Sequence, residues 1–180
     1  MKQCHLIISA SFITQEVFAK QLIDCFNLSK IRMKDLLINE LRNESKLSDS
    51  INEYLKSGKL IPTSLITALL RKKISVIKND LLIIGYPKTK EQFTTLNDLL
   101  SNSGYKISKL WILNFQNVDK QFSISNDREM TKKFIEQAKK SKVIEELVND
   151  STITSKINIK TINTWDSETM KQKIISMHRI

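Results

Sequence analysis

The sequence is poor in residues that make sharp turns, crosslinks or metal sites. In 180 residues it has three glycines, two prolines, two cysteines and two histidines. No metal-ligand spacing relates Cys4 to Cys25, so we expect two reduced structural thiols rather than a disulfide or a metal site. His5 lies in an apolar stretch and His178 is far from it in the chain. No grouping of residue types therefore indicates a nucleophilic or metal-dependent centre, and we expect no cofactor.

The sequence also lacks an apolar run near the roughly 20 residues that a membrane-spanning helix needs. Its first residues, MKQCHLIISASF, contain a short apolar run without a convincing signal-peptide cleavage site. We therefore expect a cytoplasmic protein with no membrane partner. A content of 41% hydrophobic and 27% charged residues fits one globular domain over residues 1–180.

Charge is plentiful and mostly of one sign. The 29 Lys and Arg residues exceed the 19 Asp and Glu residues, which gives a formal net charge of +10. A basic surface attracts polyanions only weakly and without specificity. A helix predicted over residues 127–148 faces RNA or an acidic protein in one interpretation and solvent in the other. The lysines that line this helix are Lys132, Lys133, Lys139, Lys140 and Lys142.

The segment LLIIGYPKTKEQ organises the chain. Its four apolar residues, 81–84, are bounded by turn-forming residues, which is typical of a strand covered on both faces. Thr89 and Gln92 match an N-cap and its capping-box partner, which predicts a helix over residues 90–100. Because ligands bind at the carboxyl ends of strands in open α/β sheets, Lys88, Thr89 and Gln92 stand where a site is expected.

Strands alternate with helices along the rest of the chain. Strands are predicted at residues 5–9, 81–84, 109–115 and 157–162, with a strand end near 30, and helices at residues 14–27, 30–42, 47–56, 62–74, 90–100, 127–148 and 167–178. Gly58 is placed at a helix C-cap and Pro62 in the first turn of the next helix. The alternation predicts an α/β fold, a three-layer parallel β-sheet of about five strands with helices on both faces.

Several large apolar side chains are assigned to the core by periodicity. Val17 and Phe18 are predicted to face inward from the first helix and Ile38 from the next. Trp111 alternates with its strand neighbours, which predicts a core position. Trp165 lies in a turn, where it is either a core residue or an exposed anchor for a partner.

The stretch between the first strand and the first helix is where a phosphate-binding loop would lie. It reads SASFITQEV. Such a loop uses glycines to turn backbone N–H groups toward phosphates, a Lys to neutralise them, and a Ser or Thr after that Lys for magnesium. The stretch has neither Gly nor Lys, and its hydroxyls are not at that spacing.

Several short motifs, taken in order, resemble adenylate kinases and related nucleoside monophosphate kinases. SGKLIPTSL is similar to the GKLV-type stretch after the family's monophosphate-binding helices, and IGYPKT is similar to its DGFPRT-type motif. Gln92 stands where the family has the glutamine that reads adenine. KLWILNF is similar to the next sheet strand, and DREMTKKF to the start of the long C-terminal helix. The resemblance covers nearly the whole chain and implies a P-loop NTPase fold of the adenylate kinase type, with a reduced monophosphate-binding helical subregion at about residues 30–60.

On the ATP side, the chain departs from the family. The resemblance places Ser9, Phe12, Thr14, Gln15 and Val17 at or near the positions of the phosphate-loop glycines, lysine and hydroxyl residue. Ile84 replaces the Asp that helps organise magnesium. The bulk of Phe12 and Ile13 suggests that apolar side chains fill the phosphate space. The segment near residues 116–127 is too short for the usual lid.

On the AMP side, the resemblance implies contacts from Gly58, Lys59, Gly85, Lys88 and Gln92. The plainer interpretation is that Gln92 only caps a helix, Lys88 is solvated and Lys59 covers apolar surface with its stem. Lys88 keeps the charge of the family's Arg but not its bidentate fork.

Further family residues on the phosphate-binding side are also replaced. Met33 and Ile38 stand where the family has Thr and Arg, and Ile124 and Ile135 lie near two expected arginines. Because phosphoryl transfer depends on positioning and charge, the joint loss indicates a catalytically degenerate, non-enzymatic member of the family. Such a chain would act as a protein-interaction scaffold or an adenine-nucleotide sensor. Two alternatives stay open: a divergent nucleoside monophosphate kinase that uses ATP and AMP, and a basic accessory protein of a ribonucleoprotein.

Overall fold

A computed structural model describes residues 1–9, 12–43, 45–57, 59, 61–115, 154–159 and 167–178. The strands are β1 (Lys2–Ser9), β2 (Ser29–Arg32), β3 (Leu81–Ile84), β4 (Tyr105–Phe115) and β5 (Thr154–Ile159). The helices are α1 (Phe12–Phe26), α2 (Met33–Leu41), α3 (Lys46–Lys56), α4 (Thr63–Ile74), α5 (Lys90–Asn102) and α8 (Ser167–His178). The strands form one parallel sheet in the order β2-β3-β1-β4-β5.

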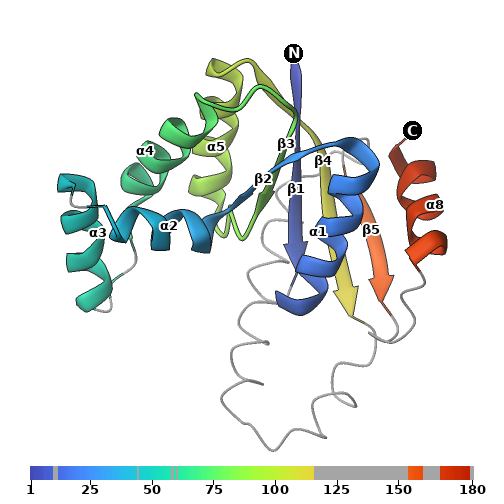
Figure 1. The fold of residues 1–180 in the computed structure, drawn as a ribbon, viewed down its shortest axis with the longest axis horizontal. Helices are drawn as coiled ribbons and strands as arrows, with labels where there is room; N and C mark the ends of the chain where they lie inside the picture. The colour runs from blue at the N-terminus through green and yellow to red at the C-terminus, as the bar shows by residue number, and fades with distance from the viewer. Residues whose placement is uncertain are drawn as a thin grey trace, which may run out of the picture.

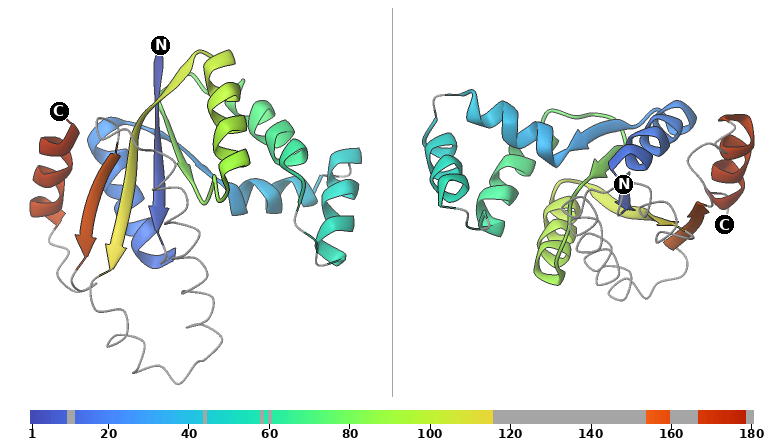
Figure 2. Two further views of the ribbon diagram at one scale, coloured as in Figure 1. Left: turned by 180° about the vertical axis from the view of Figure 1, so that it is seen from behind. Right: turned by 90° about the horizontal axis from the view of Figure 1, so that it is seen from below.

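Helices cover both faces of the sheet, as the sequence predicts. α1 and α8 lie on one face and α4 and α5 on the other, while α2 and α3 lie to the side, beyond the edge strand β2 (Figures 1 and 2). Alternate residues of β1 supply the two cores: Leu6 and Ile8 pack with α4 and α5, and Ile7 packs with α1 and α8. The predicted three-layer α/β architecture is therefore confirmed.

The strand β3 is covered on both faces. All four of its residues are buried, and β2 and β1 pair with it on either side. Each buried Leu or Ile side chain contributes about 2 kcal/mol relative to exposure. The unbroken apolar run LLII is thus explained by burial from two sides, and the predicted bounds of this strand are confirmed.

Several predicted strand boundaries are displaced. β1 starts at Lys2 rather than at residue 5, β4 starts at Tyr105 rather than at 109, and β5 is Thr154–Ile159 rather than 157–162. Lys2 pairs with Tyr105 through the backbone, so both strands run past their apolar cores. Backbone pairing does not require apolar side chains, which is why apolar runs alone understate the length of these strands.

Two side chains predicted to face the core do not. Val17 is 42% exposed and Ile38 is 38% exposed, whereas Phe18, one residue after Val17, is buried. Successive residues of a helix point about 100° apart, so Val17 lies off the face of α1 that Phe18 packs against the sheet. Pro62 is the N-cap of α4 rather than a residue of its first turn. Trp165 and the helix predicted over 127–148 lie outside the described residues.

The two cysteines are free thiols, as predicted. Burial, and to a lesser extent the Asp80 carboxylate, raises the pKa of the Cys4 thiol far above its ordinary value. Cys4 therefore remains a protonated core residue. Over the described ranges, no helix has the length and apolar character to cross a membrane.

Trp111 is a core residue, as predicted, and it pairs with His5. Both side chains are buried, and the indole Nε1–H donates to Nδ1 of His5 over 3.3 Å. Because an indole N–H can only donate, Nδ1 must accept, which places the imidazole proton of the neutral ring on Nε2. The rings of Phe18 and Phe26 complete the cluster with edge-on contacts. His5 therefore has a structural role in this core.

We predict that Trp111→Phe lowers the free energy of unfolding by about 2–4 kcal/mol, because it opens a cavity and removes the donor to a buried acceptor. Urea unfolding measures this loss. The same substitution in a His5→Phe background should cost at least about 1 kcal/mol less. Equal losses in the two backgrounds would show that packing alone accounts for the effect.

Candidate functional site

The carboxyl ends of the parallel strands meet at one edge of the sheet, where ligands bind in open α/β folds (Figure 1). Ser9 ends β1, and Gln15 follows in α1. Gly85, Lys88 and Gln92 follow β3. The fold therefore brings the segments predicted to form the ATP side and the AMP side to a common edge.

On the side predicted to face ATP, α1 begins soon after β1. β1 ends at Ser9 and α1 begins at Phe12, two residues earlier than predicted, so only two residues separate strand from helix. Ser9 is 4% exposed and Gln15 is 7% exposed, whereas Val17 faces solvent. Gln15, which the sequence resemblance places at the phosphate-loop lysine, is therefore a buried neutral amide. The side chains of Phe12 and Thr14 lie outside the described part, so the proposed filling of the pocket stays a prediction.

The two side chains that the sequence resemblance places at the family's magnesium position, Ile84 and Val17, supply no oxygen ligand. Ile84 is buried and apolar, and Val17 has no hydroxyl to offer. Mg²⁺ is bound through carboxylate, phosphate and water oxygens, and neither side chain supplies an oxygen. Among the described residues, no three or more His, Cys, Asp or Glu side chains are grouped so that they could hold a metal ion.

A charged cluster at the end of β2 was not predicted from the sequence. The Glu16 carboxylate on α1 forms ion pairs with Arg32 and, over 3.7 Å, with Lys30. Arg32 also lies 3.5 Å from the Asp35 carboxylate. Protein carboxylates therefore already neutralise cations at this edge. The alternation of Lys30 and Arg32 in KIR signals that both side chains share one strand face, but nothing local to the sequence identifies Glu16 as their partner.

On the AMP side, the turn after β3 has a special backbone. Gly85 has φ +80°, and a Cβ built there would meet no atom within 4 Å. The glycine is thus required by the left-handed conformation and not by crowding. Tyr86, next in the chain, is buried, and burial raises its pKa to about 12.

The predicted N-cap Thr89 is present at the start of α5, but the return hydrogen bond of Gln92 goes to the residue before the N-cap rather than to the N-cap itself, as a capping box would have it. The Thr89 hydroxyl accepts from the Gln92 N–H over 3.2 Å, and Oε1 of Gln92 accepts from the Lys88 N–H over 2.8 Å. The oxygen of Gln92 is therefore engaged in capping, and its amide N–H groups remain the donors available to a base. The Lys59 side chain is exposed, and the backbone N–H of Lys59 donates to the Tyr54 carbonyl over 3.1 Å. Gly58 lies outside the described residues.

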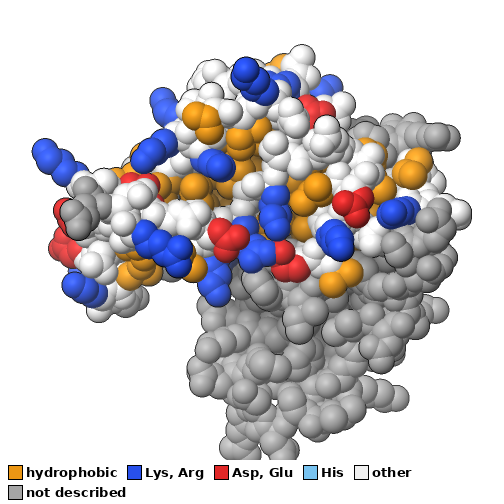
Figure 3. Space-filling model, in the orientation of Figure 1, with side chains coloured by type: hydrophobic (Ala, Val, Ile, Leu, Met, Phe, Trp, Pro, Cys, Tyr) orange, Lys and Arg blue, Asp and Glu red, His pale blue; other side chains and the backbone are white. Residues whose placement is uncertain are grey.

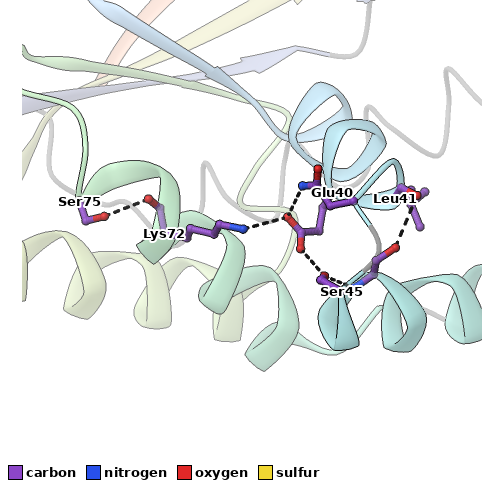
Figure 4. Close-up of polar contacts among 7 residues, drawn as sticks. Glu40, Leu41, Ser45, Lys72 and Ser75 are labelled. Carbon is purple, nitrogen blue, oxygen red and sulfur yellow. Dashed lines mark hydrogen bonds and ion pairs between the residues drawn. The ribbon is translucent and has the colours of Figure 1, made fainter.

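A buried carboxylate connects α2, α3 and α4 (Figure 4). Oε1 of Glu40 accepts from the Ser45 hydroxyl over 2.8 Å, and Oε2 accepts from the Asn43 amide over 3.3 Å and from Lys72 over 3.5 Å. The same Ser45 oxygen accepts from the Ser48 N–H and so caps α3. The Ser45 hydrogen bond lowers the pKa of Glu40, assisted by Asn43 and Lys72 and opposed by burial.

Together, the parallel strand order and the helices on both faces define an α/β protein with a P-loop NTPase-like fold. A model of the adenylate kinase family matches residues 14–174. The chain belongs to the adenylate kinase family.

Individual relatives match shorter stretches. The adenylate kinase of Pyrococcus furiosus is 30% identical over 89 residues, which is 49% of this chain and 40% of the relative. The adenylate kinase of Caldicellulosiruptor bescii is 30% identical over 105 residues, 57% of this chain and 48% of the relative. That of Mycobacterium sp. strain MCS is 34% identical over 85 residues, 46% of this chain and 47% of the relative. The matches thus span about half the length of these relatives, or less.

We predict that Glu40→Gln destabilises the protein at neutral pH and that the difference from the parent shrinks as the pH falls. A carboxyl whose pKa is lowered by folding contributes stability above its unfolded-state value of 4.5, and this contribution is lost as the pH falls through the folded-state value. Unfolding of both proteins from pH 7 to pH 3 measures the difference.

The matched comparison is Lys72→Met. The Lys72 side chain is 68% exposed, so water screens its ion pair with Glu40, and we expect a smaller loss than for Glu40→Gln. A difference between Glu40→Gln and the parent that is unchanged from pH 7 to pH 3 would contradict the assignment.

Proposed function

We propose that this protein is a catalytically degenerate member of the adenylate kinase family that does not transfer phosphoryl groups. The observation that carries the proposal is the start of α1 at Phe12, which leaves two residues after β1 and a buried Gln15 in place of a lysine. A phosphate loop needs successive backbone N–H groups and a cation directed at the phosphates. This segment supplies a helical turn and a neutral amide instead.

The energetic argument is cumulative. Phosphoryl transfer is catalysed almost entirely by positioning and by stabilising charge on the transferred group. Removing one such group costs about two to three orders of magnitude in rate. The chain has lost the loop lysine, and buried Ile84 replaces the magnesium-side carboxylate. These losses support a role in binding rather than turnover, as an interaction scaffold or a nucleotide sensor.

We predict no AMP phosphorylation by the purified chain with ATP and magnesium, at a detection limit about 10⁵-fold below the adenylate kinase of Caldicellulosiruptor bescii assayed beside it. Formation of ADP is followed by chromatography. Phosphorylation that is lost in Gln92→Ala would instead identify a divergent nucleoside monophosphate kinase with a rebuilt ATP site.

The AMP side supports retained nucleotide binding. Gly85 has the left-handed backbone conformation of a tight turn at the carboxyl end of β3. Lys88 follows in the segment before α5, and Gln92 lies in the first turn of that helix. The amide N–H groups of Gln92 can donate to a ring nitrogen while its oxygen caps the helix. We therefore propose AMP as the ligand of this side. Its affinity is weak because the ammonium group of Lys88 is a point charge, whereas an arginine guanidinium would bind a phosphate with two parallel hydrogen bonds.

We predict that calorimetry detects AMP binding in the parent and that Gln92→Glu abolishes it without loss of stability. Glutamate keeps the oxygen that accepts from the Lys88 N–H, but it loses the amide donors. Gln92→Ala removes both functions and should also lower the free energy of unfolding by about 1 kcal/mol. AMP binding that survives in Gln92→Glu would show that Gln92 is only a capping residue.

The hypothesis of an RNA-associated role rests on lysines of the segment 127–148, which lies outside the described residues. It stays a prediction.

A further inference from the structure

A groove of about 430 Å³ lies beside the edge strand β2, between α2 and α4. It is separate from the carboxyl-edge site, because none of Gln15, Gly85, Lys88 or Gln92 lines it. Neither the phosphate-loop argument nor the AMP argument uses this groove.

The groove has an apolar lining. Ile31 and Leu69 are buried, Leu36 is half-buried, and Val76 at the end of α4 is 71% exposed. Leaving a valine side chain in water costs about 1.5 kcal/mol relative to burial. An apolar side chain of a partner placed against Val76 and Leu36 would recover part of this cost.

The backbone of β2 has one edge that no described strand covers. β2 is at the end of the strand order, with β3 on its other side. The Ser29 N–H donates to the Asp80 carbonyl at the start of this pairing, so the backbone groups of Ser29 and Ile31 face β3. Because the backbone groups of successive strand residues point to opposite edges, those of Lys30 face away from β3, and Lys30 is one of the residues that line the groove. An extended segment could therefore hydrogen-bond there.

The rim of the groove is cationic. Lys72 and Lys73 line it with exposed side chains, whereas the ammonium group of Lys30 is paired with Glu16 on α1. Its two carboxylates are already engaged: Asp35 lies by Arg32, and Glu40 is buried among hydroxyl, amide and ammonium donors. Lys and Arg side chains gather over the α2, α3 and α4 side of the molecule, with hydrophobic side chains between them (Figure 3). The charge complement of this rim is an acidic ligand.

We propose that this groove binds an extended acidic segment of a partner protein, which adds to the edge of β2 and places apolar side chains between α2 and α4. The inference rests on the proposed interaction role and identifies this groove as the surface that binds the partner. The lining favours a peptide over a nucleic acid, because no aromatic side chain lines the groove to stack on bases and aliphatic side chains occupy its floor.

The test uses the full chain and a fluorescein-labelled ten-residue peptide in which glutamate alternates with valine. We expect saturable anisotropy with this peptide and none with a peptide that has lysine in place of glutamate. The double variant Lys72→Glu, Lys73→Glu should weaken binding at least tenfold. Lys56→Glu, Lys78→Glu makes the same change of net charge outside the groove and should leave the affinity within twofold.

A backbone variant tests strand addition. Lys30→Pro removes the outward N–H, and an edge strand tolerates proline at such a position. We expect it to lose binding, whereas Lys30→Ala keeps the N–H and retains most of the affinity. Circular dichroism checks that the proline variant folds; if it does not, the two double lysine variants decide the matter.

Several results would overturn the proposal. One is the absence of binding of the acidic peptide. A second is an equal loss of peptide affinity in the two double lysine variants. A third is saturable binding of a ten-nucleotide single-stranded RNA that depends on Lys72 and Lys73, with no binding of the peptide. Peptide binding is measured without nucleotide. AMP phosphorylation by the parent would therefore refute the proposed loss of catalysis while the peptide result for the groove stands.

Discussion

Burial of β3 from both faces is the constraint on which the rest of the structure depends. Four adjacent apolar residues can all be buried only if helices cover the sheet on both sides and strands pair on both edges. β1 and β2 provide the edges, α1 one cover, and α4 with α5 the other. The turn at Gly85 and the cap at Thr89 then fix where α5 begins, so the position of Lys88 and Gln92 is a consequence of the same burial.

The core contacts of α1 show what the sheet requires of this helix. Among its described side chains, Phe18, Ala19 and Leu22 pack in the core, and they lie beyond the segment predicted to stand at the phosphate loop. Their burial on the sheet does not require a bound phosphate. Starting the helix at Phe12 adds a turn of backbone hydrogen bonds at its amino end. These core contacts of α1 therefore do not depend on the residues near Gln15.

The sequence was sufficient to predict the features that local patterns determine. The run LLII gave β3, the spacing of Thr89 and Gln92 gave the cap of α5, and the alternation around Trp111 gave its core position. Features that depend on distant partners were not predicted. The pairing of Glu16 with Arg32 joins α1 to β2, and the Lys2 to Tyr105 pairing joins residues more than a hundred positions apart. The exposure of Val17 likewise depends on the direction in which α1 crosses the sheet.

The distribution of charge separates the two sides of β2. On the side of α1, the Glu16 carboxylate neutralises Arg32 and Lys30. These cations therefore need no external anion. An incoming phosphate would have to compete with the Glu16 carboxylate for them. On the side of α4, Lys72 extends into solvent although it lies 3.5 Å from Glu40, and Lys73 is exposed next to it. Exposed cations beside an apolar floor attract an acidic ligand at little cost in desolvation, whereas those paired with Glu16 do not. The cations on the α1 side of β2 are thus paired with a carboxylate of the same chain, whereas the exposed lysines on the α4 side are suited to an acidic partner.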